Sequence, residues 1–100
     1  MAEVQRTPAA HEDLLQIWLH MAQDHSEAAD RFLDNIDRKC QLLATQPHMG
    51  RSRSDLGRGV RGFPVGDYLV LYHPIDGGIE VLRVIHGSRD VPAVFRKRRS

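Results

Sequence analysis

Val-Arg-Gly-Phe-Pro-Val-Gly-Asp-Tyr-Leu-Val-Leu-Tyr-His, residues 60–73, is the stretch that decides the fold of this 100-residue chain. Two apolar runs flank Gly66-Asp67, a dipeptide suited to a hairpin turn with glycine at its first central position. The pattern predicts strands over 60–65 and 68–73. After a turn at 74–78, the run Ile-Glu-Val-Leu-Arg-Val-Ile-His predicts a third strand over 79–86. The second and third strands carry apolar residues on both faces, which places them at the centre of the sheet.

A short strand and a helix are predicted at the start of the chain. Residues 4–6 form the expected strand. Thr7 is then a suitable N-cap, and Pro8 suits the first helical position because its missing N–H is not needed there. Apolar residues recur at helical spacing to about Gln23, where the helix is expected to end.

A second helix is predicted to follow after a break of about three residues. Ser26 is its expected N-cap, an apolar stripe runs from Ala29 to Leu43, and Pro47 ends it. Residues 47–59 are polar, glycine-rich and basic, as expected of a loop. The order β-α-α-β-β-β predicts an α+β domain spanning residues 1–100. In it a helical hairpin covers one face of an antiparallel sheet, and a basic tail follows at about 91–100.

Charge is distributed unevenly along the chain. Residues 1–50 carry a net charge of −4 and residues 51–100 a net charge of +5, with 12 of the 14 basic residues being arginine. Arginine presents a rigid fork of donors suited to phosphates and carboxylates. The second half is therefore expected to contact a macromolecule.

Cysteine content, histidine spacing and hydropathy indicate the compartment of the protein and the kinds of site that it can hold. Cys40 is the only cysteine, so an internal disulfide is excluded, which suits a reducing cytoplasm. Cys40 falls on the apolar stripe of the second helix and is expected to be a buried structural thiol. The histidines lack metal-ligand spacing, so neither a metal nor a cofactor is expected, and no run is long enough to span a membrane.

Short motifs along nearly the whole chain resemble the RelE/ParE toxin superfamily, and ParE-type toxins in particular. They are Thr7-Pro8-Ala9-Ala10, Asp13-Leu14, Ile17-Trp18, Pro47-x-x-Gly50, Val60-Arg61-x-Phe63-x-Val65-Gly66-x-Tyr68-x-Val70-x-Tyr72 and Val81-x-Arg83-Val84-x-His86-x-x-Arg89-Asp90. Each motif is short, but all occur in the right order and on the expected elements. The resemblance implies the toxin of a bacterial type II toxin–antitoxin pair, held inactive in a hetero-oligomer by a small acidic DNA-binding antitoxin.

Two activities are known in the superfamily, and the resemblance leaves both open. ParE-like members inhibit DNA gyrase and block replication, whereas RelE-like members cut messenger RNA on the ribosome. This chain lacks the lysine pair and the C-terminal tyrosine of the RelE-like nucleases, which favours a gyrase inhibitor that acts by binding and has no catalytic residues. If the chain were instead a ribonuclease, Arg61, Arg83 and His86 would be its catalytic residues. A binding module without toxicity is the third alternative.

Two surfaces are expected on this interpretation. The target-binding surface comprises Arg58, Arg61, Arg83, His86 and Arg89, joined in one basic patch by Arg51 and Arg53. The antitoxin is expected to contact apolar side chains of the helical hairpin and the sheet, with the candidates Leu14, Trp18, Met21, Leu33, Leu43 and Tyr72.

Overall fold

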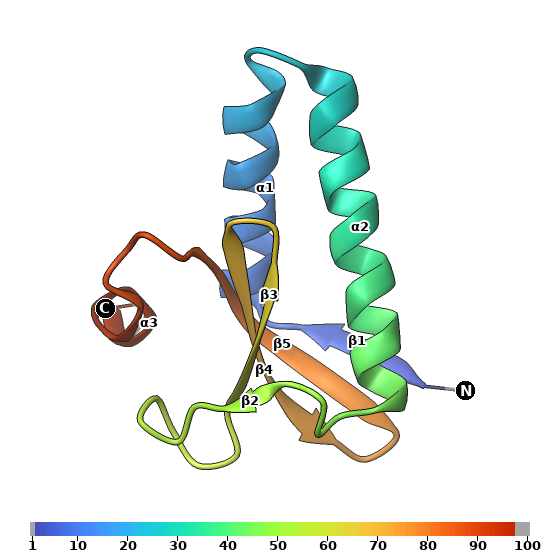
Figure 1. Cartoon of the computed structure of the whole chain (residues 1–100), viewed down its shortest axis with the longest axis vertical. Helices are drawn as coiled ribbons and strands as arrows, with labels where there is room; N and C mark the ends of the chain where they lie inside the picture. Colours follow the sequence, from blue (N-terminus) through green and yellow to red (C-terminus); the bar gives the residue numbers. More distant parts are fainter. Residues whose placement is uncertain (1, 98–100) are drawn as a thin grey trace.

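A helical hairpin lies across one face of a five-stranded sheet in the computed structural model, which describes residues 2–97 (Figure 1). This confirms the predicted α+β architecture. The elements in chain order are β1 (Glu3–Arg6), α1 (Pro8–Ala22), α2 (Ser26–Thr45), β2 (Arg51–Ser52), β3 (Arg61–Val65), β4 (Tyr68–Ile75), β5 (Gly78–His86) and α3 (Val91–Lys97).

The two long helices begin in different ways. The Thr7 side chain accepts a hydrogen bond from the Ala10 N–H, as an N-cap does, and Pro8 is the first residue of α1. The predicted N-cap of α2 is wrong by one residue, because Ser26 already belongs to the helix. His25 occupies the cap position with an extended backbone and makes no side-chain cap bond. The short connection forces α1 and α2 into an antiparallel pair.

The strand order is β1-β5-β4-β3-β2, so β4 and β5 are interior strands as predicted. Gly66 opens the β3–β4 turn with a φ of 59°, a left-handed backbone that favours glycine. The sheet is antiparallel from β5 to β2, but β1 pairs with β5 in parallel. A wholly antiparallel sheet was predicted. Hairpin turns reveal antiparallel neighbours in a sequence, and β1 has no such turn beside it.

Two segments differ from their predicted form. Arg51–Ser52, in the expected loop, pairs with β3 as the short edge strand β2. Residues 91–97, in the expected basic tail, form helix α3, whose Ala93 N–H donates to Asp90 Oδ1. Residues 98–100 lie outside the described part of the chain.

The core has two parts, one on each face of the sheet. The larger part lies between the hairpin and the sheet, where Ile36, Cys40, Leu43, Val70 and Tyr72 are all buried. The smaller part lies on the opposite face and consists of Leu71, Ile85 and Val91, with the partly buried Leu56, Leu69, Val94 and Phe95 around them. Because α3 covers only part of this second face, the rest of it stays open to solvent.

Candidate functional site

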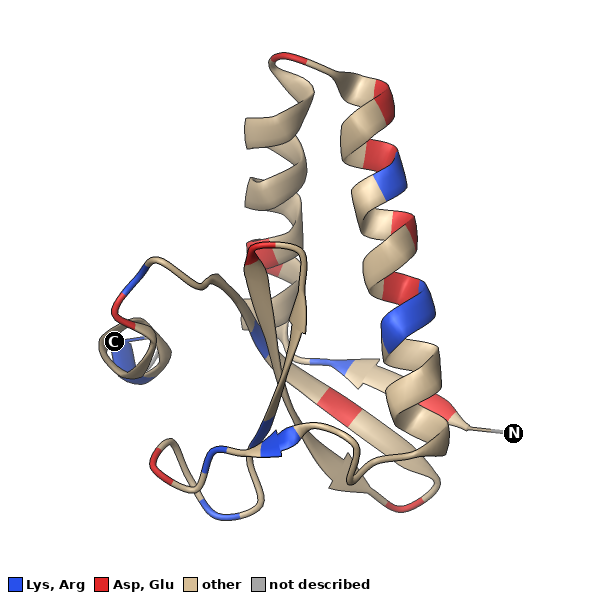
Figure 2. Cartoon of the chain, in the orientation of Figure 1, with Lys and Arg blue, Asp and Glu red and all other residues tan. Residues whose placement is uncertain are grey.

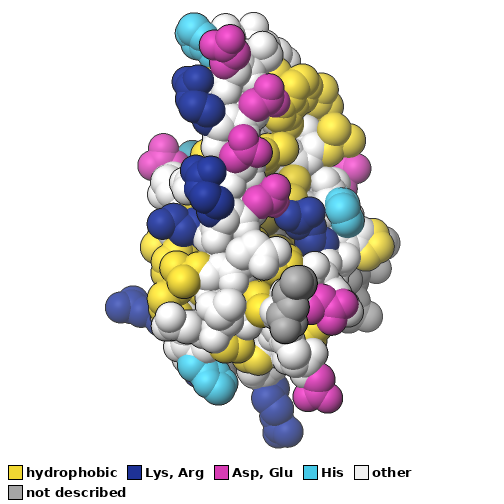
Figure 3. Space-filling model, turned by 90° about the vertical axis from the view of Figure 1, so that its right-hand side faces the viewer, with side chains coloured by type: hydrophobic (Ala, Val, Ile, Leu, Met, Phe, Trp, Pro, Cys, Tyr) yellow, Lys and Arg dark blue, Asp and Glu magenta, His cyan; other side chains and the backbone are white. Residues whose placement is uncertain are grey.

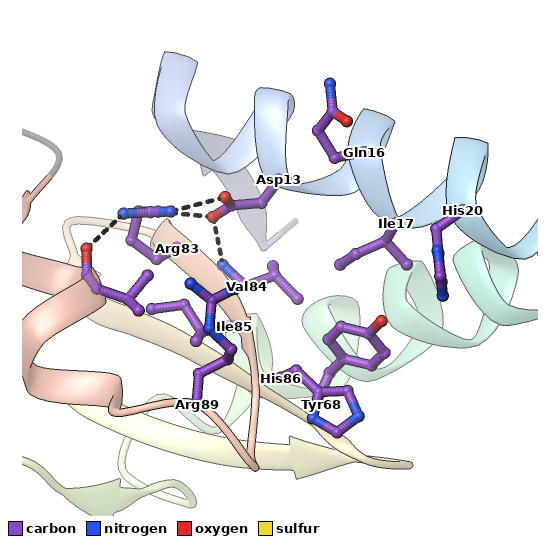
Figure 4. A pocket seen from close by; sticks show the side chains of 11 residues that line it. Asp13, Gln16, Ile17, His20, Tyr68, Arg83, Val84, Ile85, His86 and Arg89 are labelled. Atoms are coloured by element: carbon purple, nitrogen blue, oxygen red, sulfur yellow. Dashed lines mark hydrogen bonds and ion pairs between the residues drawn. The ribbon is translucent and has the colours of Figure 1, made fainter.

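A hollow of about 230 Å³ lies between α1 and the end of β5 (Figure 4). Three of the predicted target-binding residues, Arg83, His86 and Arg89, line it together. The other lining residues are Asp13, Gln16, Ile17, His20, Tyr68, Val84, Ile85 and Val94. The hollow therefore combines residues from both halves of the chain.

The chain path explains why the hollow forms there. The pairing of β1 with β5 ends at Arg6 and Val81, so the last residues of β5 have no strand on that side. The Thr7 N–H donates to Val81 O at 3.0 Å, and Thr7 Oγ1 donates to Leu82 O at 2.8 Å. Helix α1 then runs beside the remaining edge of β5, and the hollow lies between them.

Asp13 and Arg83 form the wall of the hollow. Arg83 Nε donates to Asp13 Oδ2 at 2.7 Å, and Arg83 Nη2 donates to Asp13 Oδ1 at 2.8 Å. Asp13 Oδ2 also accepts from the Val84 N–H at 2.9 Å, and Arg83 Nη1 donates to Val94 O on α3. The hydrogen bond to Asp13 raises the pKa of Arg83 above its ordinary value. Only 12% of the Arg83 side chain and 14% of the Asp13 side chain are exposed. The pair is therefore structural, and it joins α1, β5 and α3.

His86 and Arg89 lie on the open side of the hollow. His86 Nδ1 lies 3.1 Å from the Ser88 N–H and 2.8 Å from Ser88 Oγ, and its ring packs edge-on against Tyr68 with centroids 4.9 Å apart. Arg89 is exposed, and within residues 2–97 its guanidinium has no hydrogen bond or ion pair. Arg89 is therefore the cation of this site that is available to a ligand.

Arg61 and Arg58 lie elsewhere. Arg61 donates to His48 O at 3.2 Å and to Gly50 O at 2.7 Å, so it fixes the loop after α2. Arg61 is paired with Tyr72 and Arg83 with Leu71, and successive residues of β4 face opposite ways. Arg58 is exposed in the 53–60 loop and does not line the hollow. The ribonuclease set of Arg61, Arg83 and His86 therefore does not converge on one point.

The predicted single basic patch is also divided. Arg51 and Arg53 line a separate hollow of about 580 Å³ with Gly62, Pro64 and Leu69. Arg53 is paired with Asp55 through two hydrogen bonds, at 3.0 and 3.1 Å. Figure 2 shows the basic residues in several separate groups. The sequence did not predict this separation, because residues 51–52 were expected to belong to a loop and instead form the edge strand β2.

Three of the predicted antitoxin contacts are corrected, because Leu14, Leu43 and Tyr72 are buried in the core. Tyr72 Oη donates to Pro47 O at 2.8 Å and accepts from the Gly50 N–H at 2.9 Å. The Pro47-x-x-Gly50 motif and Tyr72 thus form one structural unit. Burial raises the pKa of the Tyr72 hydroxyl.

The other three candidates, Trp18, Met21 and Leu33, are partly exposed on the hairpin. Trp18 Nε1 donates to Asp30 Oδ1 at 2.8 Å and so ties α1 to α2. Sequence reasoning missed Leu15 and Leu19, which are 51% and 45% exposed on the outer side of α1. Figure 3 shows the side of the molecule that faces right in Figure 1, with charged side chains in a column beside a group of hydrophobic ones.

No group of three or more potential metal ligands occurs among residues 2–97. Within the same residues, no helix has the length and apolar character needed to cross a membrane. Cys40 is buried, and burial raises the pKa of its thiol from 9.0 to about 11. A group whose ionised form is this disfavoured is a poor nucleophile.

Comparisons with known proteins agree with this architecture. Residues 4–91 match the family model described as the ParE toxin of the type II toxin–antitoxin system parDE. The chain is 29% identical to Toxin ParE3 of Caulobacter vibrioides, over 98% of this chain and 99% of that one, and 28% identical to Toxin ParE1 of Mycobacterium tuberculosis, over 85% and 89%. A solved structure titled as a chromosomal ParDE system from P. aeruginosa matches with a TM-score of 0.71 and 21% identity, over 86% of this chain and 96% of that one.

Proposed function

This chain belongs to the ParE toxin family of type II toxin–antitoxin systems, and from that membership we propose that it inhibits DNA gyrase by binding to it and is neutralised by its cognate antitoxin. The inhibition involves no cleavage of nucleic acid by the toxin itself. Such a protein acts in the cytoplasm, where gyrase and its DNA are located.

The observation that carries this proposal is the arrangement of Arg61 and Arg83. Phosphoryl chemistry on RNA needs cationic donors aimed at one phosphate. The Arg61 side chain is bonded to loop carbonyl oxygens, and the Arg83 side chain is bonded to Asp13. The two pair with β4 residues on opposite faces of the sheet. Both guanidinium groups are thus engaged within the fold, which supports a toxin that binds its target over one that cleaves RNA.

We place the antitoxin on the helical hairpin. Trp18, Met21 and Leu33 are partly exposed there. Leu15 and Leu19, which are about one helical turn apart on α1, add further apolar surface. Apolar residues at this spacing suit the apolar face of a partner helix.

A supercoiling assay with purified gyrase tests the proposal. Addition of the toxin is expected to reduce supercoiling, and addition of the antitoxin to restore it. The control is the toxin purified together with the antitoxin. Unchanged supercoiling at a large molar excess of toxin, together with codon-dependent cleavage of messenger RNA on ribosomes, would reject gyrase as the target.

A ribosome-dependent messenger RNA interferase is the second candidate, supported by the presence of His86 and Arg89 in the lining of one hollow. Replacing Arg61, Arg83 and His86 together is a poor test, because Arg83 is needed by the fold. His86→Gln alone removes the candidate general base and leaves both arginines in place. Toxicity that survives this substitution counts against the interferase.

A further inference from the structure

We infer that the hollow between α1 and β5 binds the carboxylate of an acidic side chain on the protein that this toxin inhibits. The identity of that protein rests on the proposed function, whereas the site itself is inferred from the residues that line the hollow. Figure 4 shows His20 reaching from α1 toward the Tyr68 ring, while Arg89 extends from the segment after β5.

The charge of the lining is the first argument. The carboxylate of Asp13 is already matched by the Arg83 fork and by the Val84 N–H, so it does not leave an excess negative charge in the hollow. Arg89 has no side-chain partner within residues 2–97. Counted over Asp13, Arg83 and Arg89, the lining carries one positive charge in excess, which suits a single carboxylate better than a phosphate dianion.

The shape of the hollow and its apolar walls are the second argument. Ile17, Val84, Ile85 and Val94 contribute apolar surface to the lining. This surface suits the methylene stem of an aspartate or glutamate whose head reaches Arg89. The volume of about 230 Å³ exceeds the roughly 150 Å³ that accepts a benzene molecule in a protein interior, so one side chain fits. A nucleic acid strand would instead need a row of unpaired cations along a groove.

The groups around Arg89 complete the site. The Tyr68 hydroxyl and the Gln16 amide are uncharged donors on the lining, and the imidazoles of His20 and His86 are further candidate donors to an anion. Tyr68 is held between the rings of Phe32 and His86, with centroid distances of 5.3 and 4.9 Å. The donor surface is therefore supported by aromatic packing and does not have to be assembled on binding.

Titration of the full chain with sodium butyrate, followed by NMR at constant ionic strength, tests the site independently of any target. Butyrate mimics the side chain of glutamate. Saturable shifts are expected for the His20 and His86 ring signals and the Arg89 Nε signal. Arg89→Gln is expected to weaken binding at least tenfold, because it removes the positive charge and breaks no side-chain hydrogen bond or ion pair within the described residues. The matched control Arg38→Gln, on the exposed face of α2, should leave it unchanged.

Three outcomes would overturn the inference. They are no saturable shift with butyrate, equal loss of binding in Arg89→Gln and Arg38→Gln, and saturable binding of inorganic phosphate or a short oligothymidine but not of butyrate. The last result would identify a phosphate site.

The gyrase assay is a second test of the inference. Arg89→Gln is expected to need at least tenfold more toxin for half-inhibition, and Arg38→Gln the wild-type amount. Wild-type inhibition by Arg89→Gln would reject the hollow as the docking point. If the wild-type toxin itself leaves gyrase active, the proposed function fails, whereas the butyrate titration still decides whether the hollow binds a carboxylate.

Discussion

Asp13 on α1 accepts two hydrogen bonds from the guanidinium of Arg83 on β5, although the residues are 70 positions apart in the chain. The same carboxylate accepts the Val84 N–H, and the same guanidinium donates to Val94 O. One ion pair thus connects the acidic half of the sequence to the basic half. It also removes Arg83 from the groups available for target chemistry.

The first prediction concerns this pair. Asp13→Ala is expected to lower the free energy of unfolding by about 2 kcal/mol, because it leaves a largely buried guanidinium and a backbone N–H without their acceptor. Urea unfolding followed by circular dichroism measures the change. The control is Asp55→Ala, which removes the partner of Arg53 at an exposed position and should have little effect. Equal losses in the two variants would contradict a structural role for Asp13.

The second prediction concerns Gly50. A Cβ on Gly50 would lie 2.8 Å from Tyr72 Cε1 and closer still to the hydroxyl oxygen, and Tyr72 is buried and held by the loop. Gly50→Ala is therefore expected to cost roughly 1–3 kcal/mol of stability through overpacking. In a double-mutant cycle with Tyr72→Phe, the double variant should lose less than the sum of the single losses. Additive losses would show that the added Cβ does not clash with the Tyr72 hydroxyl.

The third prediction compares two neighbouring leucines of α1. Leu14 is 9% exposed and Leu15 is 51% exposed. Leu14→Ala is expected to cost about 2–4 kcal/mol, as truncation of a buried leucine does. Leu15→Ala should leave stability within about 0.5 kcal/mol of the wild type, as surface substitutions usually do. Thermal unfolding of the two variants measures the difference, and similar midpoints would mean that the rotation of α1 is misplaced.

Hydrophobic periodicity was sufficient to predict the two long helices and the three long strands, because each buries a continuous face. It was not sufficient for β2, which consists of Arg51 and Ser52 and has no apolar face to reveal it. It also could not show the direction of β1, because a four-residue strand with no hairpin turn can pair either way. Helix α3 was expected as part of a basic tail, since few of its residues are buried.

The candidate site was predictable only in part. Arg83, His86 and Arg89 were expected on one surface together with Arg58 and Arg61. The structure brings the first three together in the hollow, and the other two do not line it. The α1 side of the hollow, with Asp13 and His20, could not be found, because it depends on how far α1 extends beyond β1. Tyr72 was assigned to a surface although it is buried, since a tyrosine in a strand has the same appearance in sequence whether its hydroxyl faces solvent or a loop carbonyl.

The fourth prediction concerns pH and Cys40. Burial raises the pKa of this thiol from 9.0 to about 11, and the nearby charges of Arg6 and Asp37 act in opposite directions. Between pH 9 and about pH 11 the Cys40 thiol has released its proton in the unfolded chain but still holds it in the folded chain. Stability from this group is therefore complete below pH 9 and is lost as pH rises toward 11, by about 2–3 kcal/mol in total.

Unfolding free energies of wild type and Cys40→Ala, measured from pH 8 to pH 11, isolate this effect. Cys40→Ala is less stable at pH 8 because it leaves a small cavity, but the gap between the two proteins should narrow as pH rises. Tyr72 has a pKa raised by burial too and weakens both proteins at high pH, so its contribution cancels in the difference. Parallel curves across this range would contradict the prediction, because they would mean that the Cys40 thiol ionises as readily in the folded chain as in the unfolded one.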